Sequence, residues 1–205
     1  MIITISNPKI KDAINLVSTR ACDEKRVLSP DPQNEPYWHH LVRVYYWLVQ
    51  KGESDIPTLL AAILHDSVED EHVTIEEIKE IFGNEVAELV FLLSEEIYSD
   101  HNSNADRAYY FQEIDDYSDT KIRLKALKIK VADRYDNLIG LSFTDFEKKK
   151  EQYRREVDQF FRRFASEVGM EEYINEGLAV LNGETKPPDI SVELNFSEFD
   201  EVKIK

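Results

Sequence analysis

Apolar residues recur every three or four positions through most of this chain, which is the spacing of one face of an α-helix. The first such stretch covers residues 8–24, and its apolar stripe consists of Ile10, Ala13, Ile14 and Val17. The pattern continues along the chain and predicts helices over residues 8–24, 37–51, 55–64, 74–83, 84–93, 105–117, 119–142, 144–167 and 169–182. Together these helices predict an all-α domain.

Residues that favour helix ends stand at several of these boundaries. Asn7-Pro8 precedes the first helix, and Lys51-Gly52 follows the second. Thr74 and Glu77 have the spacing of a capping box, in which each side chain accepts a hydrogen bond from the other residue's backbone N–H. The capping residues therefore agree with the apolar pattern.

The pattern changes after Lys186. Alternate residues from Ile190 to Phe196 are apolar, which is the period of a β-strand and not of a helix. We therefore expect a helical domain over residues 1–186 and a C-terminal extension over residues 187–205. The extension forms either a small β hairpin, which can pair with residues 1–5, or a disordered acidic tail.

Four residues with metal-binding or acid–base side chains directly follow the apolar run 59–64. They are His65, Asp66, Glu69 and Asp70. Because an isolated buried carboxylate is costly, carboxylates at the end of an apolar stretch need a partner such as a metal ion. In a helix, residues four apart share a face, so these side chains can meet in one cavity. The segment indicates either a metal site or an amphipathic helix whose polar end is solvated.

Two further stretches favour the metal site. His39 and His40 stand at the start of the predicted helix 37–51, and Asp133 follows an apolar stretch far downstream. Histidine and aspartate together form a nitrogen and oxygen ligand set that suits a divalent transition metal such as Mn, Fe or Zn. These residues therefore indicate divalent-metal chemistry.

Three motifs, in order, resemble those of the HD-type metal-dependent phosphohydrolases, above all the hydrolase domain of RelA/SpoT proteins and the small alarmone hydrolases. The family pattern is Glu-Pro-Tyr-x-x-His, then Leu-His-Asp-x-x-Glu-Asp, then Ala-Asp-Arg-x-x-Asn-Leu. The matching segments here are Glu35-Pro36-Tyr37-Trp38-His39-His40, Leu64-His65-Asp66-Ser67-Val68-Glu69-Asp70 and Ala132-Asp133-Arg134-Tyr135-Asp136-Asn137-Leu138. The resemblance implies an HD-domain helical bundle.

The resemblance also implies a role for each matching residue. The metal ligands would be His40, His65, Asp66 and Asp133, and the expected ion is Mn²⁺ or another divalent transition metal. His40 is preferred to His39 because the apolar residues after it then fall in the family's register. The residues that orient and deprotonate the attacking water would be Glu69 and Asp70. The residues that support the site or contact the substrate would be Arg134 and Asn137.

The implied activity is removal of the 3′-pyrophosphate of guanosine alarmones, (p)ppGpp, but one departure leaves the substrate open. Before the first motif the family has a basic pair, a small residue and a glycine that help to hold guanine. This chain has Asp31-Pro32-Gln33-Asn34 there, so Arg20, Lys25 or Arg26 would have to replace them. The alternatives are an HD-type phosphohydrolase acting on another nucleotide and, further away, a non-enzymatic metal-binding scaffold.

Composition and charge narrow the choice of partners. The chain has 205 residues, 42% of them hydrophobic and 32% charged, which is ordinary for a globular protein. A net charge of -16 argues against DNA or RNA as a partner, and an anionic substrate then needs a locally positive pocket, which a metal ion and Arg134 can supply.

The single cysteine, Cys22, permits no intrachain disulfide. No apolar run approaches the ~20 residues that span a bilayer. We therefore expect a cytoplasmic protein that binds a small-molecule nucleotide and has no membrane partner; the sequence leaves its oligomeric state open.

Overall fold

The computed structural model describes residues 2–21, 23–69, 73–94 and 104–196. Within these ranges the regular secondary structure is helical apart from two short strands, which confirms the predicted all-α class. The helices are α1 (Pro8–Arg20), α2 (Trp38–Gln50), α3 (Ile56–Leu64), α4 (Ile75–Phe82), α5 (Asn84–Leu93), α6 (Asn104–Asp115), α7 (Thr120–Ser142), α8 (Glu147–Glu156), the π-helical turn η2 (Val157–Phe161), α9 (Arg162–Val168) and α10 (Glu171–Leu181). The strands are β1 (Ile2–Ile5) and β2 (Glu193–Phe196). In the described part of the chain, no helix is long and apolar enough to cross a membrane.

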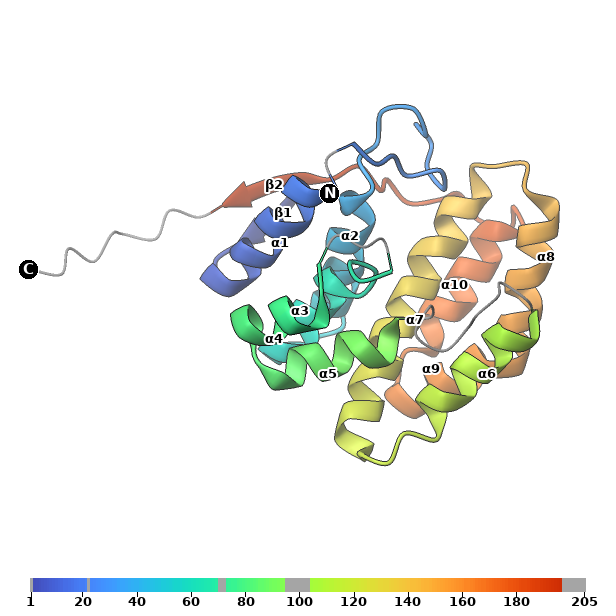
Figure 1. Ribbon diagram of the computed structural model, residues 1–205. Coiled ribbons are helices and arrows are strands. Elements are labelled where there is room, and N and C mark those ends of the chain that lie inside the picture. The colour runs from blue at the N-terminus through green and yellow to red at the C-terminus, as the bar shows by residue number, and fades with distance from the viewer. Residues whose placement is uncertain (1, 22, 70–72, 95–103, 197–205) are drawn as a thin grey trace, which may run out of the picture.

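Helix α7 runs through the middle of the molecule, with α1 to α5 on one side and α6 and α8 to α10 on the other (Figure 1). Its apolar residues lie all around the helix, and almost every side chain from Ala126 to Leu141 is buried. A helix that is apolar on all sides is one that other elements surround. The polar residues within it, Asp133 and Asp136 among them, therefore lie near the centre of the fold and need partners there.

Helix α3 ends immediately before the His-Asp motif. The carboxylate of Asp55 caps it by accepting a hydrogen bond from the backbone N–H of Thr58 at 3.0 Å. Every side chain from Thr58 to Leu64 is buried. The backbone then turns over residues 65–69, at the point where the polar side chains of the motif begin.

The helix boundaries follow the caps that the sequence shows. Thr74 and Glu77 form the expected capping box, with hydrogen bonds of 3.1 and 3.0 Å. Gly83 separates α4 from α5 with a φ of 99°, a conformation that glycine adopts without strain. Short local signals are therefore enough to define these two helices.

The predicted helix over 144–167 is divided in the structure. It begins at Glu147, and the π-helical turn η2 separates α8 from α9. Val157 and Phe161, at the two ends of this turn, are both fully buried. A π turn accommodates one additional residue and shifts the buried face, which the apolar pattern does not reveal.

The C-terminal strand pairs with the N-terminal one. Strand β2 runs parallel to β1, with Ile2 opposite Glu193 and Ile5 opposite Phe196. The expected pairing with the N-terminus is thus present, and because the two strands are parallel they do not form a hairpin with each other. A second strand of a C-terminal hairpin would fall in residues 197–205, which lie outside the described residues. Upstream of β2, the carbonyl of Ile190 accepts a hydrogen bond from Arg43 Nη1 at 3.3 Å, so this segment packs onto the helical domain.

Candidate active site

A pocket of about 420 Å³ lies where α2, the turn after α3, α7 and α8 come together. His40 reaches it from α2, Asp66 and Glu69 from the turn, and Asp133 and Asn137 from α7. The structure therefore gathers residues from all three sequence motifs into one cavity. Asp70, the second residue expected to act on the water, lies outside the described residues.

Three buried side chains in this region can hold a metal ion. One potential ligand atom from each of His40, His65 and Asp133 lies within 4.8 Å of the other two. Nε2 of His40 is 3.3 Å from Oδ1 of Asp133, and Nε2 of His65 is 3.8 Å from the same oxygen. His39 is not part of this group, because its ring packs edge-on against Trp38.

Asp66 stands beside the group with a more accessible carboxylate. Its Oδ1 is 3.1 Å from Nε2 of His65, and its Oδ2 is 3.8 Å from Nε2 of His40. Oδ2 also accepts a hydrogen bond from the Tyr37 hydroxyl at 2.5 Å. That bond holds Asp66 in place on the pocket wall.

The protonation of the two imidazoles fits a cation at this point. Nδ1 of His65 lies 2.8 Å from the carbonyl oxygen of Ala62, and Nδ1 of His40 lies 2.7 Å from Oδ2 of Asp136. Because a carbonyl and a carboxylate can only accept, each Nδ1 carries a proton, and in the neutral form of each ring Nε2 is the nitrogen left to bind an ion. Nε2 of His65 is fully buried and makes no hydrogen bond, although Asp66 Oδ1 lies 3.1 Å from it. A buried imidazole nitrogen without a hydrogen bond, beside a second imidazole and two carboxylates, is the arrangement that a metal ion satisfies.

The charges around the site also favour a cation. Burial lowers the pKa of His65, but the charges of Asp66 and Asp133 outweigh that effect and raise it to about 10. Burial raises the pKa of Asp133, but the charge of Lys130 and the imidazole of His40 hold it well below its usual range. The carboxylates therefore stay ionised, and a metal ion that binds the neutral form of His65 would displace a proton from it.

A buried carboxylate behind His40 was not identified by the sequence motifs. Asp136 is fully buried and accepts hydrogen bonds from Arg43 Nε at 2.7 Å and Trp47 Nε1 at 3.0 Å, besides its contact with His40. Burial raises the pKa of Asp136, but the charge of Arg43 and the contact with His40 hold it far below its usual range. The sequence feature that could have identified Asp136 is its position three residues after Asp133, which places the two carboxylates on neighbouring faces of α7.

The two residues expected to contact the substrate lie in different surroundings. Asn137 lines the pocket, donates to Asp133 Oδ1 at 2.5 Å and accepts from Arg26 Nη2 at 2.5 Å. Arg134 is buried away from the pocket lining, with its guanidinium 3.9 Å from the ring centre of Tyr153. It donates to Glu156 Oε2 at 2.5 Å. These contacts of Arg134 connect α7 to α8.

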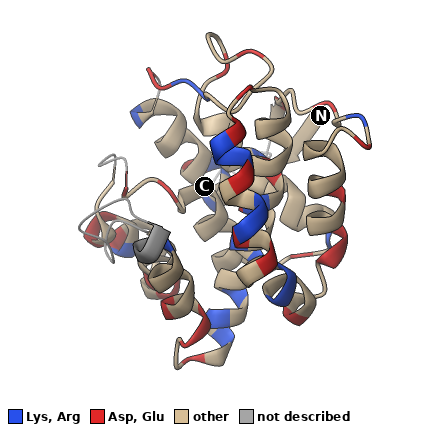
Figure 2. Cartoon of the chain, turned by 90° about the vertical axis from the view of Figure 1, so that its right-hand side faces the viewer, with Lys and Arg blue, Asp and Glu red and all other residues tan. Residues whose placement is uncertain are grey.

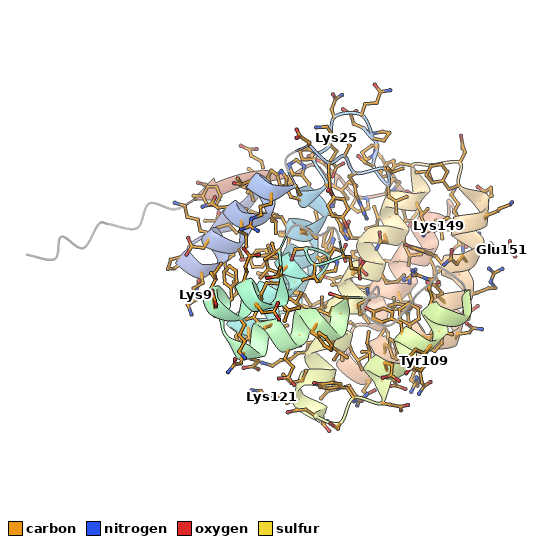
Figure 3. The ribbon with its side chains drawn as sticks, viewed as in Figure 1. Lys9, Lys25, Tyr109, Lys121, Lys149 and Glu151 are labelled. Atoms are coloured by element: carbon orange, nitrogen blue, oxygen red, sulfur yellow. The ribbon has the colours of Figure 1, made fainter. Side chains whose placement is uncertain are left out.

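Positively charged side chains line the pocket beside the candidate metal site although the chain is strongly acidic. Arg26, Arg107, Lys130 and Lys149 all line the pocket. Lys149 comes from α8, where it is labelled in Figure 3, and Figure 2 shows basic and acidic residues interspersed along the helices of that side. None of these four residues belongs to the three sequence motifs. They supply the local positive charge that an anionic substrate requires.

The segment Asp31-Pro32-Gln33-Asn34 does not contribute to the pocket lining. It is exposed, and the Asn34 amide donates to the Asp31 carboxylate at 3.0 Å. Of the three basic residues considered as replacements, Arg20 pairs with Glu77 and Lys25 is exposed on the loop labelled in Figure 3. Arg26 reaches the pocket because an antiparallel bridge between Lys25 and Pro36 turns the loop back on itself.

Comparison with known proteins shows a match that covers most of the chain. The HD domain family model matches residues 22–171. The guanosine-3′,5′-bis(diphosphate) 3′-pyrophosphohydrolase MESH1 of Xenopus tropicalis is 32% identical over 161 residues, which cover 78% of this chain and 82% of that protein. MESH1 of Danio rerio is 43% identical over 61 residues, 29% of this chain and 34% of that protein.

A longer relative and a solved structure complete the comparison. A probable guanosine-3′,5′-bis(diphosphate) 3′-pyrophosphohydrolase of Mycoplasma pneumoniae is 30% identical over 142 residues, 66% of this chain but only 19% of that protein. This chain thus spans about a fifth to a third of the length of some of the curated relatives it matches. The fold is similar to a structure described as "A metazoan ortholog of SpoT hydrolyzes ppGpp and plays a role in starvation responses". The TM-score is 0.69 with 24% identity, over 86% of this chain and 97% of that one.

Proposed function

Because this chain belongs to the HD domain family, we propose that it is a metal-dependent phosphohydrolase that removes the 3′-pyrophosphate of guanosine alarmones such as ppGpp. The observation that carries the proposal is the convergence of His40, His65 and Asp133 at the wall of a pocket with basic side chains. The relatives named as guanosine-3′,5′-bis(diphosphate) 3′-pyrophosphohydrolases support the choice of substrate.

The ion would be Mn²⁺ or another divalent transition metal, held by His40, His65 and Asp133 with Asp66 as a fourth ligand. When bound, such an ion lowers the pKa of water and polarises a phosphoryl oxygen. The residues themselves fit that role, because two imidazole nitrogens and two carboxylates are ligands that Mn²⁺, Fe²⁺ and Zn²⁺ share.

Hydrolysis joins the oxygen of water to the phosphorus attached to the 3′-oxygen. The bond from that phosphorus to the 3′-oxygen breaks, which leaves pyrophosphate and a nucleoside 5′-diphosphate with a free 3′-hydroxyl. Glu69, which lines the pocket, and Asp70 next to it in sequence would orient the water and accept its proton. Lys130 and Lys149 would offset the negative charge of the substrate phosphates, and Asn137 would hold Asp133 in position.

The competing proposal is that the substrate is a nucleotide with another base. One observation indicates that the site discriminates weakly between bases. The Asp31 to Asn34 segment is exposed and does not line the pocket, so the usual means of holding guanine is missing. We therefore propose hydrolysis of guanosine 3′-pyrophosphates with weaker discrimination between bases than in relatives that have the basic loop, since a site rejects an analogue only when it leaves a hydrogen-bonding group unpaired.

A release assay with Mn²⁺-loaded protein tests this function. The substrates are the guanosine and adenosine 3′-pyrophosphates, nucleoside triphosphates and deoxynucleoside monophosphates. We expect pyrophosphate from the 3′-pyrophosphates. Activity confined to the triphosphates or monophosphates would contradict the alarmone assignment, and no turnover of any substrate would leave only a metal-binding scaffold.

Two neighbouring histidines provide a matched pair of variants for the same assay. His40→Ala removes an imidazole of the cluster, whereas His39→Ala removes one that packs against Trp38 outside it. We expect activity and bound metal to be lost in the first variant only.

A further inference from the structure

One aromatic ring is exposed at the pocket. Phe146, the residue before α8, lines the pocket and has 48% of its surface accessible. The other large apolar residues that are exposed in the described part of the chain, such as Val27 and Phe143, do not line it. A half-exposed phenylalanine in a polar cavity offers a flat apolar surface to whatever fills that cavity.

Leu28 adds a second apolar group to the same pocket, and a glycine of α7 permits its position. A Cβ atom on Gly140 would lie 2.5 Å from the backbone oxygen of Leu28 and 3.0 Å from its Cβ. The loop therefore lies directly on the helix at Gly140, where any larger residue would force it away. Leu28 is partly buried there and lines the pocket.

Helix α7 forms one side of the pocket. The candidate metal site lies at one end of that side, and Leu28 and Phe146 lie at the other end. Asp133, Asn137 and Gly140 are spaced by four and three residues, so they share one face of α7. At 1.5 Å per residue, Gly140 is about 10 Å along the helix from Asp133. Phe146 follows in the connection from α7 to α8. That separation suits a nucleotide whose 3′-phosphate is at the metal and whose base lies at the far end.

We propose that Phe146 and Leu28 form the wall against which the nucleobase packs, with the base stacked on the Phe146 ring. This proposal rests on the nucleotide substrate of the proposed function and assigns the base-binding surface that the Asp31 to Asn34 segment does not provide. Because every base has a flat π surface, stacking holds bases without distinguishing their edges.

Arg26 is the basic side chain of the loop that carries Leu28, and it lines the same pocket. Its Nη2 donates to Asn137 Oδ1, which fixes the guanidinium, and its Nε–H is buried without an acceptor. One fixed guanidinium beside an apolar wall discriminates less than a set of groups matched to a base edge. The wall therefore predicts similar affinity for guanosine and adenosine substrates.

Three variants of the Mn²⁺-loaded protein test the wall, with KM and kcat measured for guanosine and adenosine 3′,5′-bis(diphosphate) and for an abasic analogue. Stacking on an aromatic side chain is worth roughly 1–3 kcal/mol, or about 5- to 150-fold. We expect Phe146→Ala to raise KM by that factor for both nucleotides and to lose the preference for a nucleotide over the abasic analogue. Phe146→Trp, which has an aromatic ring at this position, should retain the preference for a nucleotide over the abasic analogue. Phe143→Ala, which removes a comparably exposed ring from the same connection, keeps wild-type values.

A binding measurement separates this inference from the proposed function. In Phe146→Trp without metal, we expect GDP or ADP to quench more tryptophan fluorescence than in the wild type, whose tryptophans are Trp38 and Trp47, whether or not the protein turns over any substrate. Quenching in this variant, without pyrophosphate release by the wild type, would contradict the proposed phosphohydrolase activity and support the base-binding wall. Turnover with an unchanged KM in Phe146→Ala would contradict the base-binding wall and support the proposed phosphohydrolase activity.

Discussion

Oδ2 of Asp136 lies 2.7 Å from Nδ1 of His40 and thereby determines which nitrogen of that ring faces the candidate metal site. A carboxylate can only accept, so Nδ1 carries a proton and, in the neutral ring, Nε2, 3.3 Å from Asp133, is the nitrogen left to bind an ion. Arg43 and Trp47 donate to the same carboxylate and hold it in place. The orientation of one ligand is therefore set by a residue that does not line the pocket itself.

Asp136→Asn should weaken metal binding by roughly 10- to 100-fold, the usual cost of removing a partner behind a metal-binding histidine. The asparagine amide keeps the volume of the side chain but no longer supplies a carboxylate to Nδ1. The measurements are the metal affinity by calorimetry and the ¹⁵N shifts of His40, which report its tautomer. Asp116→Asn, an exposed aspartate, serves as the control. A folded Asp136→Asn protein with unchanged affinity and tautomer would show that Asp136 serves packing alone.

Glu69→Gln should retain the metal ion while turnover falls by roughly 10²- to 10⁴-fold, the range for a lost general acid–base group. The reason is that Glu69 lines the pocket but does not belong to the buried group of His40, His65 and Asp133. Metal content and kcat are measured on the same preparation. Glu80→Gln on the exposed side of α4 should change neither. Loss of metal from Glu69→Gln would instead identify Glu69 as a ligand.

Glu156 should make the stability of the protein depend on pH in the acid range. Burial raises its pKa, but the charge of Arg134 and the hydrogen bond from Arg107 outweigh that effect and lower it from 4.5 to about 2. A carboxyl group whose pKa is lower in the folded state stabilises the fold above its ordinary pKa and loses that contribution as the pH falls through the lowered value. The shift corresponds to about 3 kcal/mol in the free energy of unfolding at neutral pH.

Urea unfolding of Glu156→Gln at a series of pH values measures this contribution. The difference from the wild type should be about 3 kcal/mol at pH 7 and should shrink as the pH is lowered from about 4.5 toward 2. Glu151→Gln on the same helix removes an exposed carboxylate paired with Arg155, and we expect a change of at most about 0.5 kcal/mol. A pH-independent difference for Glu156→Gln would mean that packing and not charge holds Arg134.

The fold could be predicted from the sequence where local signals are strong. The apolar periodicity located the helices, and the caps at Asp55 and Thr74 fixed two of their starts within a residue. The π-helical turn at Val157 could not be predicted, because one additional residue in a turn leaves the apolar pattern nearly unchanged. The parallel direction of β2 depends on β1, at the other end of the chain, and no local pattern specifies it.

The site was predictable to the extent that motifs specify it. His40, His65 and Asp133 stand together because each belongs to a motif with a fixed place on a helix or turn. The basic side chains of the pocket could not be predicted in this way. Arg107 and Lys149 come from α6 and α8, and they come together only when those helices pack. Phe146 was missed for the same reason.

We propose that one divalent ion at His40, His65 and Asp133 enables release of pyrophosphate from the 3′ position of a guanosine alarmone. The most direct test is to add Mn²⁺ stepwise to metal-free protein, and to follow GDP and pyrophosphate from ppGpp by anion-exchange chromatography. We predict that the rate rises until one ion is bound per chain and that the two products appear in equal amounts. Product formation that persists in excess chelator, or orthophosphate in place of pyrophosphate, would contradict the claim.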